Sequence, residues 1–383
     1  MNQIARVEIL NEETFWPDER ARFTGDRLDA LLAWAFRKNA SDIRLQTHEP
    51  ARIQIHGRLQ QVTRRTLTES EIEEAVNKLY GADGQARLKG GEDFDVSYEV
   101  EPDRRTRMRF RVNATAVLSR GTDGGAVVAR ALPNKVKSLE EQQVESPIVE
   151  ACMPHEGLVL IAGGTGNGKS TLMAGMTRKR LEDPQSHCAI LEYSAPIEFL
   201  FDDIRGPTAM ISQSEVPRHI ATFEVALRNG MRRAGDVIII GECRDAETMS
   251  AAADAALTSH AVYSSIHAGT LSETIQRIVS LCPVDKRKAL TVAIAQTLRL
   301  VVNQRLVQST DGTRTALREF LVFNRRIRRR LSETDPDRWP NLIDELLEHE
   351  GQNFAVAARR ALDEGRITEE TVRTELKDVF DVA

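Results

Sequence analysis

A glycine-rich stretch near the middle of the chain constrains its fold more than any other feature. It fits the pattern G-x-x-x-x-G-K-[ST] at every fixed position and, with the residue that follows, reads Gly163, Gly164, Thr165, Gly166, Asn167, Gly168, Lys169, Ser170 and Thr171. An apolar run at 158–162 leads into it, and a helix-compatible segment at 171–176 leads out. A strand, a tight loop and a helix in this order direct backbone N–H groups and the positive end of a helix at one chain of phosphates. The sequence therefore predicts a nucleoside triphosphate site, with Lys169 on the β- and γ-phosphates and the Ser170 hydroxyl on Mg²⁺.

A second element of such a site follows about 75 residues further along the chain. The apolar strand pattern at 237–240 ends in Gly241 and Glu242. In proteins with this kind of loop, an acid at the end of a neighbouring strand organises Mg²⁺ and the attacking water. Glu242 is therefore the predicted Walker B acid, and with Ser170 it is an expected metal ligand.

Composition narrows the class of protein. The net charge is −5, the pI is near 6.0 and aromatic residues make up 5% of the chain, which disfavours a basic, aromatic-lined groove for nucleic acid. No run of about 18 apolar residues is present, and the first six residues lack the apolar core of a signal peptide. The cysteines lack the CxxC spacing of a zinc module; they are Cys152, Cys188, Cys243 and Cys282. We expect a reduced, cytoplasmic protein.

The hydrophobic pattern predicts two folded parts. Between 23 and 134, helical spacing at 27–36 and 69–80 is mixed with strand-like alternation at 40–45, 51–56, 94–100, 107–116 and 125–131. This mixture favours a small α+β domain with an antiparallel sheet. Residues 1–22 read as an N-terminal extension, either a docking arm or a frayed end, and 135–147 read as a linker.

From 148 to 383, short apolar strands alternate with helices. The strand candidates are 158–162, 189–191, 237–240 and 261–266. Such alternation is typical of an α/β domain in which helices cover a parallel sheet. Beyond Thr313 we expect the chain to be charged and helical.

Five stretches together resemble the secretion ATPases, the motors of pilus assembly and retraction and of type II and type IV secretion. They are 40–43, 109–113, the Asp box at 195–198, the Walker B block at 236–248 and the His box at 256–268. The resemblance runs from about residue 25 to 375 in the family's order. The compact length and the sequence Ala195-Pro196-Ile197-Glu198 resemble those of the DotB and TraJ ATPases, a branch that serves type IV secretion and conjugation.

This resemblance implies a homohexamer in which each subunit has a PAS-like N-terminal domain and a RecA-like P-loop NTPase domain. It implies ATP hydrolysis that powers a type IV secretion or conjugative transfer apparatus, with inner-membrane machinery proteins as partners. The expected location is cytoplasmic and peripheral at the inner membrane, and the composition argues against nucleic acid as a partner. A type IV pilus retraction ATPase is the alternative within the family, and a DNA translocase or helicase is the alternative from another class.

The resemblance also implies roles for residues outside the loop. His267 in the His box would lie near the γ-phosphate and sense it. Arg111 and Arg130, and after them Arg120, match positions from which N-terminal arginines approach the nucleotide and neutralise transition-state charge. The alternatives are a structural histidine at the end of a strand and ordinary charges on the surface of a sheet.

One position departs from the family. Most relatives carry a glutamate immediately before the Ala-Pro or Asp-Pro of the Asp box, and this chain has Ser194, which cannot serve as a carboxylate base. Glu192 lies two residues earlier and faces the same side of an extended strand. We expect Glu192 to supply the missing carboxylate, with a purely structural acid as the alternative, while Glu198 keeps its family position.

Two charged features are open to two readings each. The basic run at 325–330 is either a solvated helix face or a dock for an acidic partner or anionic lipid. Arg244 and Asp245 are either an interface pair or an ordinary surface ion pair.

Overall fold

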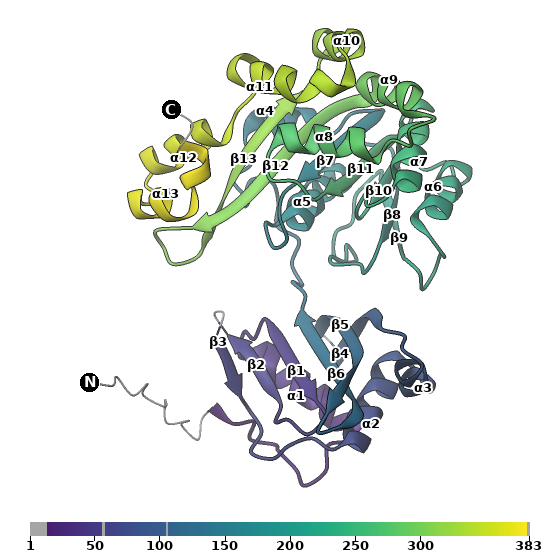
Figure 1. Ribbon diagram of the computed structural model, residues 1–383, viewed down its shortest axis with the longest axis vertical. Helices are drawn as coiled ribbons and strands as arrows, with labels where there is room; N and C mark the ends of the chain where they lie inside the picture. Colours follow the sequence, from purple (N-terminus) through teal and green to yellow (C-terminus); the bar gives the residue numbers. More distant parts are fainter. Residues whose placement is uncertain (1–13, 56–57, 105, 381–383) are drawn as a thin grey trace. The chain divides into compact units, whose positions relative to one another are not determined.

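The computed structural model describes residues 14–55, 58–104 and 106–380, and the chain divides into two compact units (Figure 1). Unit 1 is Met1–Asn134 and unit 2 is Lys135–Ala383, and each is a mixed α/β structure. Within the described residues, no helix is both long enough and apolar enough to cross a membrane.

Unit 1 is built on a six-stranded antiparallel sheet. The strand order is β3-β2-β1-β6-β5-β4, with β1 Asp42–Gln46, β2 Arg52–Ile55, β3 Arg58–Gln61, β4 Phe94–Asp103, β5 Thr106–Ser119 and β6 Thr122–Ala131. Three helices pack on it, α1 Gly25–Arg37, α2 Glu69–Tyr80 and α3 Gly84–Lys89. The antiparallel sheet was predicted, whereas the short elements β3 and α3 were not, because four to six residues carry too little periodicity.

The predicted N-terminal extension lies partly outside the described residues, which begin at 14. From Trp16 onward it is not a frayed end, because Trp16 is buried in the core of unit 1. Its ring packs edge-on against Phe23 and its backbone N–H donates to the Val62 carbonyl at 2.8 Å.

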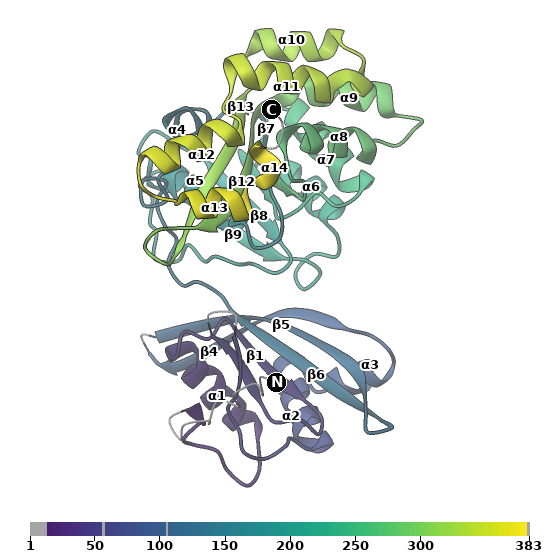
Figure 2. The same cartoon turned by 60° about the vertical axis from the view of Figure 1, so that its left-hand side comes forward.

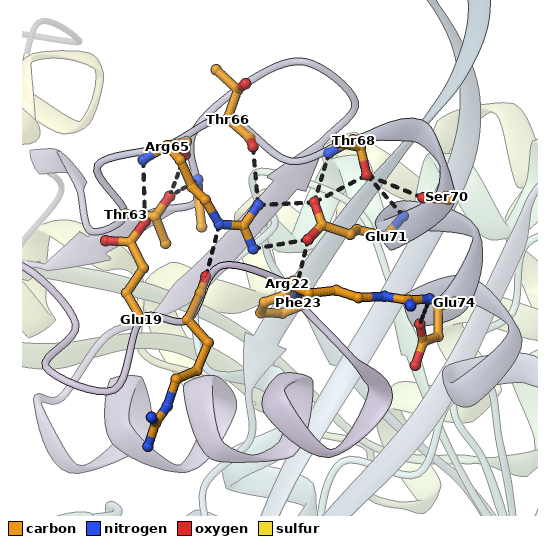
Figure 3. Close-up of polar contacts among 12 residues, drawn as sticks. Glu19, Arg22, Phe23, Thr63, Arg65, Thr66, Thr68, Ser70, Glu71 and Glu74 are labelled. Carbon is orange, nitrogen blue, oxygen red and sulfur yellow. Dashed lines mark hydrogen bonds and ion pairs between the residues drawn. The ribbon is translucent and has the colours of Figure 1, made fainter.

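A buried carboxylate ties this segment to the loop before α2 (Figure 3). Glu71 accepts hydrogen bonds from the backbone N–H groups of Phe23 and Thr68 at 2.6 and 2.8 Å. Both terminal nitrogens of Arg65 donate to it at 2.8 and 2.9 Å. Burial raises the pKa of the Glu71 carboxyl, but the hydrogen bonds from Arg65, Thr68 and Phe23 outweigh burial and bring the pKa to about 2. We call Glu71 and these three partners the Glu71 cluster.

Unit 2 is built on a seven-stranded sheet in the order β13-β12-β7-β11-β10-β8-β9, parallel except for the β12–β13 pair. The strands are β7 Gly157–Ala162, β8 Ala189–Ser194, β9 Met210–Glu215, β10 Val237–Ile240, β11 Ala261–Ile266, β12 Leu298–Gln308 and β13 Arg314–Val322. One face packs on α4 Ser146–Ala151 and α5 Lys169–Glu182. The other packs on α6 Phe223–Arg232, α7 Ala246–Leu257, α8 Leu271–Leu281 and α9 Arg287–Thr297.

The C-terminal part of unit 2 is helical from α10 onward, and Figure 2 shows α12, α13 and α14 gathered beside β12 and β13. The helices are α10 Arg325–Glu333, the short 3₁₀ turn Pro336–Arg338, α11 Trp339–Glu350, α12 Phe354–Asp363, α13 Glu369–Glu375 and α14 Lys377–Phe380. The prediction of helix immediately beyond Thr313 is wrong, because β13 pairs with β12 from Arg314 to Val322.

The segment 135–147, predicted as a linker, packs on unit 2. Val136 and Leu139 are buried in the same hydrophobic cluster as α5. Burial of these two apolar side chains, together with hydrogen bonds such as that from Arg178 to the Val136 carbonyl at 2.9 Å, holds the segment against the sheet domain.

Candidate nucleotide site

The glycine-rich loop connects the end of β7 to the start of α5, as the sequence predicted, and we call residues 163–170 the P-loop. Its glycines are needed where they stand. Gly163 has φ +146° and a Cβ there would lie 2.4 Å from the Gln304 carbonyl oxygen, while Gly168 has φ +75°. Only glycine adopts these backbone conformations in such close quarters without strain.

Lys169 is buried and turns back over the loop. Its Nζ donates to the carbonyl oxygens of Gly163 and Gly164 at 2.8 and 3.0 Å and lies 3.5 Å from Nδ1 of His267. Burial lowers the pKa of the Lys169 ammonium, and the negative charges of Glu242 and Glu198 oppose that shift. The ammonium is thus already surrounded by acceptors of the kind that phosphate oxygens would replace.

Glu242 follows β10 and is held on both carboxylate oxygens. Arg244 Nε donates to one at 2.8 Å, and His267 Nε2 lies 3.5 Å from the other. The His267 ring thus lies between the Lys169 ammonium and the Glu242 carboxylate. Glu242 and His267 directly follow β10 and β11, which are neighbours in the sheet, and Lys169 begins α5 after β7, the other neighbour of β11. The structure therefore brings three predicted residues together.

Glu192 belongs to a second polar cluster, on β8 and β9. The Ser194 hydroxyl donates to one of its carboxylate oxygens at 2.8 Å, and the Gln213 amide donates to the other at 2.7 Å. Gln213 also donates to the Phe199 carbonyl at 2.8 Å. Glu192 and Ser194 do face the same side of the strand, so the departure at position 194 places a hydroxyl donor directly on the Glu192 carboxylate.

The three predicted arginines lie in unit 1. Arg111 on β5 forms an ion pair with Asp95, with its Nε 3.0 Å from each carboxylate oxygen. Arg130 on β6 lies directly opposite Asp42 on β1, and its Nε donates to Asp42 at 2.9 Å. Arg120 lies in the turn between β5 and β6, with φ +51°.

The structure shows the partners of Arg244 and Asp245. Asp245 caps α7 by accepting from the Thr248 N–H at 2.8 Å, and Arg244 pairs with Glu242, so the two residues do not form an ion pair with each other in this chain, while the interface role stays a prediction.

Acids of unit 2 neutralise much of the basic run, which lies on α10. Arg329 and Arg330 pair with Glu333 and Glu345 at 2.7 and 3.0 Å, and Arg326 pairs with Glu350. These contacts favour the solvated helix face over a dock for lipid.

Sequence reasoning missed the residues that support the P-loop from behind. The Gln304 amide on β12 donates to the Asn167 carbonyl at 2.7 Å, and the Leu306 N–H donates to the Asn167 side chain at 3.3 Å. The one available signal was polar Asn303 and Gln304 within an otherwise apolar strand pattern.

Comparison with known proteins places this site in a family. The model of the type II/IV secretion system protein family matches residues 19–373, so the chain belongs to that family, and it is an ATPase. The predicted resemblance is confirmed.

Individual relatives cover most of the chain. The X-ray structure of the Legionella pneumophila ATPase DotB is 40% identical, with a TM-score of 0.82 over 95% of this chain and 100% of that one. The type IV pilus retraction ATPase PilT of Pseudomonas aeruginosa is 31% identical over 306 residues, 79% of this chain and 84% of PilT. A structure of the pilus retraction motor PilT with bound ADP is 26% identical, with a TM-score of 0.77 over 90% and 95% of the two chains.

Proposed function

We propose that this protein is a homohexameric ATPase motor that powers a type IV secretion or conjugative transfer apparatus. The observation that carries the proposal is the meeting of Lys169 in the P-loop with Glu242 and His267, which follow the adjacent strands β10 and β11. The likeness to DotB over nearly the whole chain supports the choice of apparatus. In this proposal unit 2 is a RecA-like domain and unit 1, from residue 23, is a PAS-like domain.

The residues present fit a magnesium nucleotide. The hydroxyl of Ser170 in the first turn of α5 and the carboxylate of Glu242 at the end of β10 are oxygen donors of the kind Mg²⁺ takes beside phosphates. When bound, Mg²⁺ neutralises charge that develops on the phosphate oxygens. The N–H groups of residues 163–171 and the Lys169 ammonium hold the phosphates, and Lys169 exchanges its contacts with the Gly163 and Gly164 carbonyls for phosphate oxygens.

Two acids compete for the role of general base. We propose Glu192, whose carboxylate the Ser194 hydroxyl and the Gln213 amide hold in place. Glu198, whose charge acts on Lys169, would then assist electrostatically. His267 would report the presence of the γ-phosphate to Glu242, since its imidazole stands between Lys169 and Glu242.

Arginines of unit 1 complete the site in this proposal. Arg111, Arg130 and Arg120 would neutralise transition-state charge when unit 1 meets a nucleotide in the assembled ring. The protein would act in the cytoplasm, peripheral at the inner membrane, with membrane machinery proteins as its partners. Pilus retraction is the second candidate, favoured by the 31% identity to PilT.

The test combines assembly, turnover and genetics. Light scattering should give six times the chain mass of 42.8 kDa in the presence of ATP. Deletion of the gene in its native host should abolish conjugation or protein export, and the Lys169→Ala variant should fail to restore it. Loss of twitching with normal transfer would favour pilus retraction instead. Strong stimulation of the ATPase by single-stranded DNA would favour a translocase.

A further inference from the structure

A buried arginine on β13 joins three parts of unit 2. Arg318 is 2% exposed and lies directly opposite Gln304 on β12. Its Nε donates to the Gln304 side-chain oxygen at 2.8 Å. Its Nη1 donates to Glu145 at 3.0 Å and to the Gln143 carbonyl at 3.1 Å, and its Nη2 donates to the Gln142 carbonyl at 3.0 Å.

Both ends of this network reach the P-loop region. Gln304 uses its amide to hold the Asn167 carbonyl at 2.7 Å, two residues before Lys169. Gln142 uses its amide to hold the Thr171 carbonyl at 3.1 Å, two residues after Lys169. The residues that Arg318 orders therefore hold the backbone on both sides of the lysine.

The same arginine holds the segment through which the chain enters unit 2 from unit 1. Residues 142–145 lie within the connecting segment 135–147 and provide three of the four Arg318 acceptors. Burial lowers the pKa of Arg318, and the charge of Glu145 opposes that shift, so the guanidinium depends on this segment for its counter-charge.

We propose that Arg318 is a positioning residue for ATP: it sets the backbone of the P-loop through Gln304 and couples it to the connecting segment at 142–145. The proposal rests on the P-loop being the nucleotide site. A guanidinium suits this task because its planar fork serves several acceptors at fixed angles, which a lysine ammonium does not. Removing it leaves the buried Gln304 side-chain oxygen without its donor and takes from Glu145 its counter-charge, leaving that carboxylate only the longer hydrogen bond from the Gln352 amide at 3.4 Å.

The test compares Gln304→Leu, Arg318→Lys and Arg318→Met by steady-state ATPase and by binding of fluorescent MANT-ATP. We expect each to raise KM for ATP and the MANT-ATP Kd by roughly tenfold, with a smaller fall in kcat, because loosened phosphate contacts weaken binding before and during the reaction. Gln304→Leu and Arg318→Met should be non-additive in the double variant, since they break one chain of contacts.

Arg180→Met is the matched control. Arg180 is also buried in unit 2, and it donates to the Tyr263 hydroxyl and the Pro154 carbonyl instead of the P-loop support. It should lower the Tm and leave KM unchanged.

Two outcomes would overturn the inference in different ways. If Lys169→Ala is inactive but Gln304→Leu and Arg318→Lys keep the wild-type KM and Kd, Arg318 serves stability alone. If Lys169→Ala keeps wild-type turnover and binding, the nucleotide site itself is misplaced, and the proposed function fails with the inference. Arg318→Lys and Gln304→Leu keep the test decisive if Arg318→Met does not fold.

Discussion

The Glu71 cluster of unit 1 and the Lys169–Glu242–His267 group of unit 2 each bring charged side chains together. They differ in how tightly hydrogen bonds hold those side chains. Glu71 receives short hydrogen bonds from four donor groups, and these bring its pKa to about 2. In unit 2, His267 lies 3.5 Å from both Lys169 and Glu242, and 44% of its side chain is exposed. The Glu71 network is closed and stabilises the fold, whereas in the unit 2 group the contacts of His267 are long and the Lys169 ammonium holds backbone carbonyls that phosphate oxygens can replace.

The largest expected effect is on hydrolysis, from Glu242→Gln. The variant should bind MANT-ATP normally and lose turnover by roughly 10³-fold, because the P-loop still grips phosphate while metal and water are no longer organised. Arg244→Ala is the control, since Arg244 contacts the same carboxylate from an exposed position. Unchanged turnover with normal Mg²⁺ dependence in Glu242→Gln would refute the Walker B assignment.

The second effect separates the two readings of Glu192. If Glu192 is the base, Glu192→Gln should reduce kcat by roughly 10²-fold, and Ser194→Glu should bring no gain because it places two carboxylates in contact. If Glu192 is structural, Glu192→Gln should be nearly silent and Ser194→Glu should raise the rate. Steady-state ATPase rates on matched protein preparations decide between these patterns.

Substitution of Glu71 should lower the free energy of unfolding of unit 1 without lowering the ATPase rate. Because the folded-state pKa of Glu71, about 2, lies below the ordinary glutamate value of 4.5, its contribution to stability is present above pH 4.5 and is lost as the pH falls toward 2. Glu71→Gln should cost unit 1 about 2–3 kcal/mol at neutral pH and flatten this acid dependence. Denaturant titrations between pH 3 and pH 7 measure both quantities. An unchanged acid dependence in the variant would show that Glu71 is not its source.

The smallest effects should come from the unit 1 arginines. Arg111→Ala or Arg130→Ala should lower kcat by roughly tenfold and raise KM less. A guanidinium stabilises the negative charge that develops on the γ-phosphate in the transition state more than it stabilises bound ATP. Both arginines also pair with carboxylates, Asp95 and Asp42. Asp95→Asn is therefore the control that removes the pair and keeps the arginine. A raised KM with an unchanged kcat would show that these arginines only help to bind ATP and do not stabilise the transition state.

The sequence was most informative where the chemistry is local. The P-loop, Glu242 and the bounds of α2 follow from spacing within a few residues, and the structure has each where it was predicted. β13 was missed because the charged sequence beyond Thr313 was taken as helical, whereas Arg318 and Glu319 within it are buried in a strand. The partner that compensates Arg318 lies 173 residues away in the chain, so no local pattern could have revealed the pair.

The most direct test of the central claim is one paired measurement of ATPase rate and thermal unfolding on Lys169→Ala and Glu71→Gln. We propose that Lys169 holds phosphate, whereas Glu71 stabilises unit 1 through its hydrogen bonds, so the two variants should fail in opposite assays. We predict that Lys169→Ala abolishes turnover with a Tm close to wild type, and that Glu71→Gln lowers the Tm and keeps its kcat. Wild-type turnover in Lys169→Ala would contradict the account, whatever the result for Glu71→Gln.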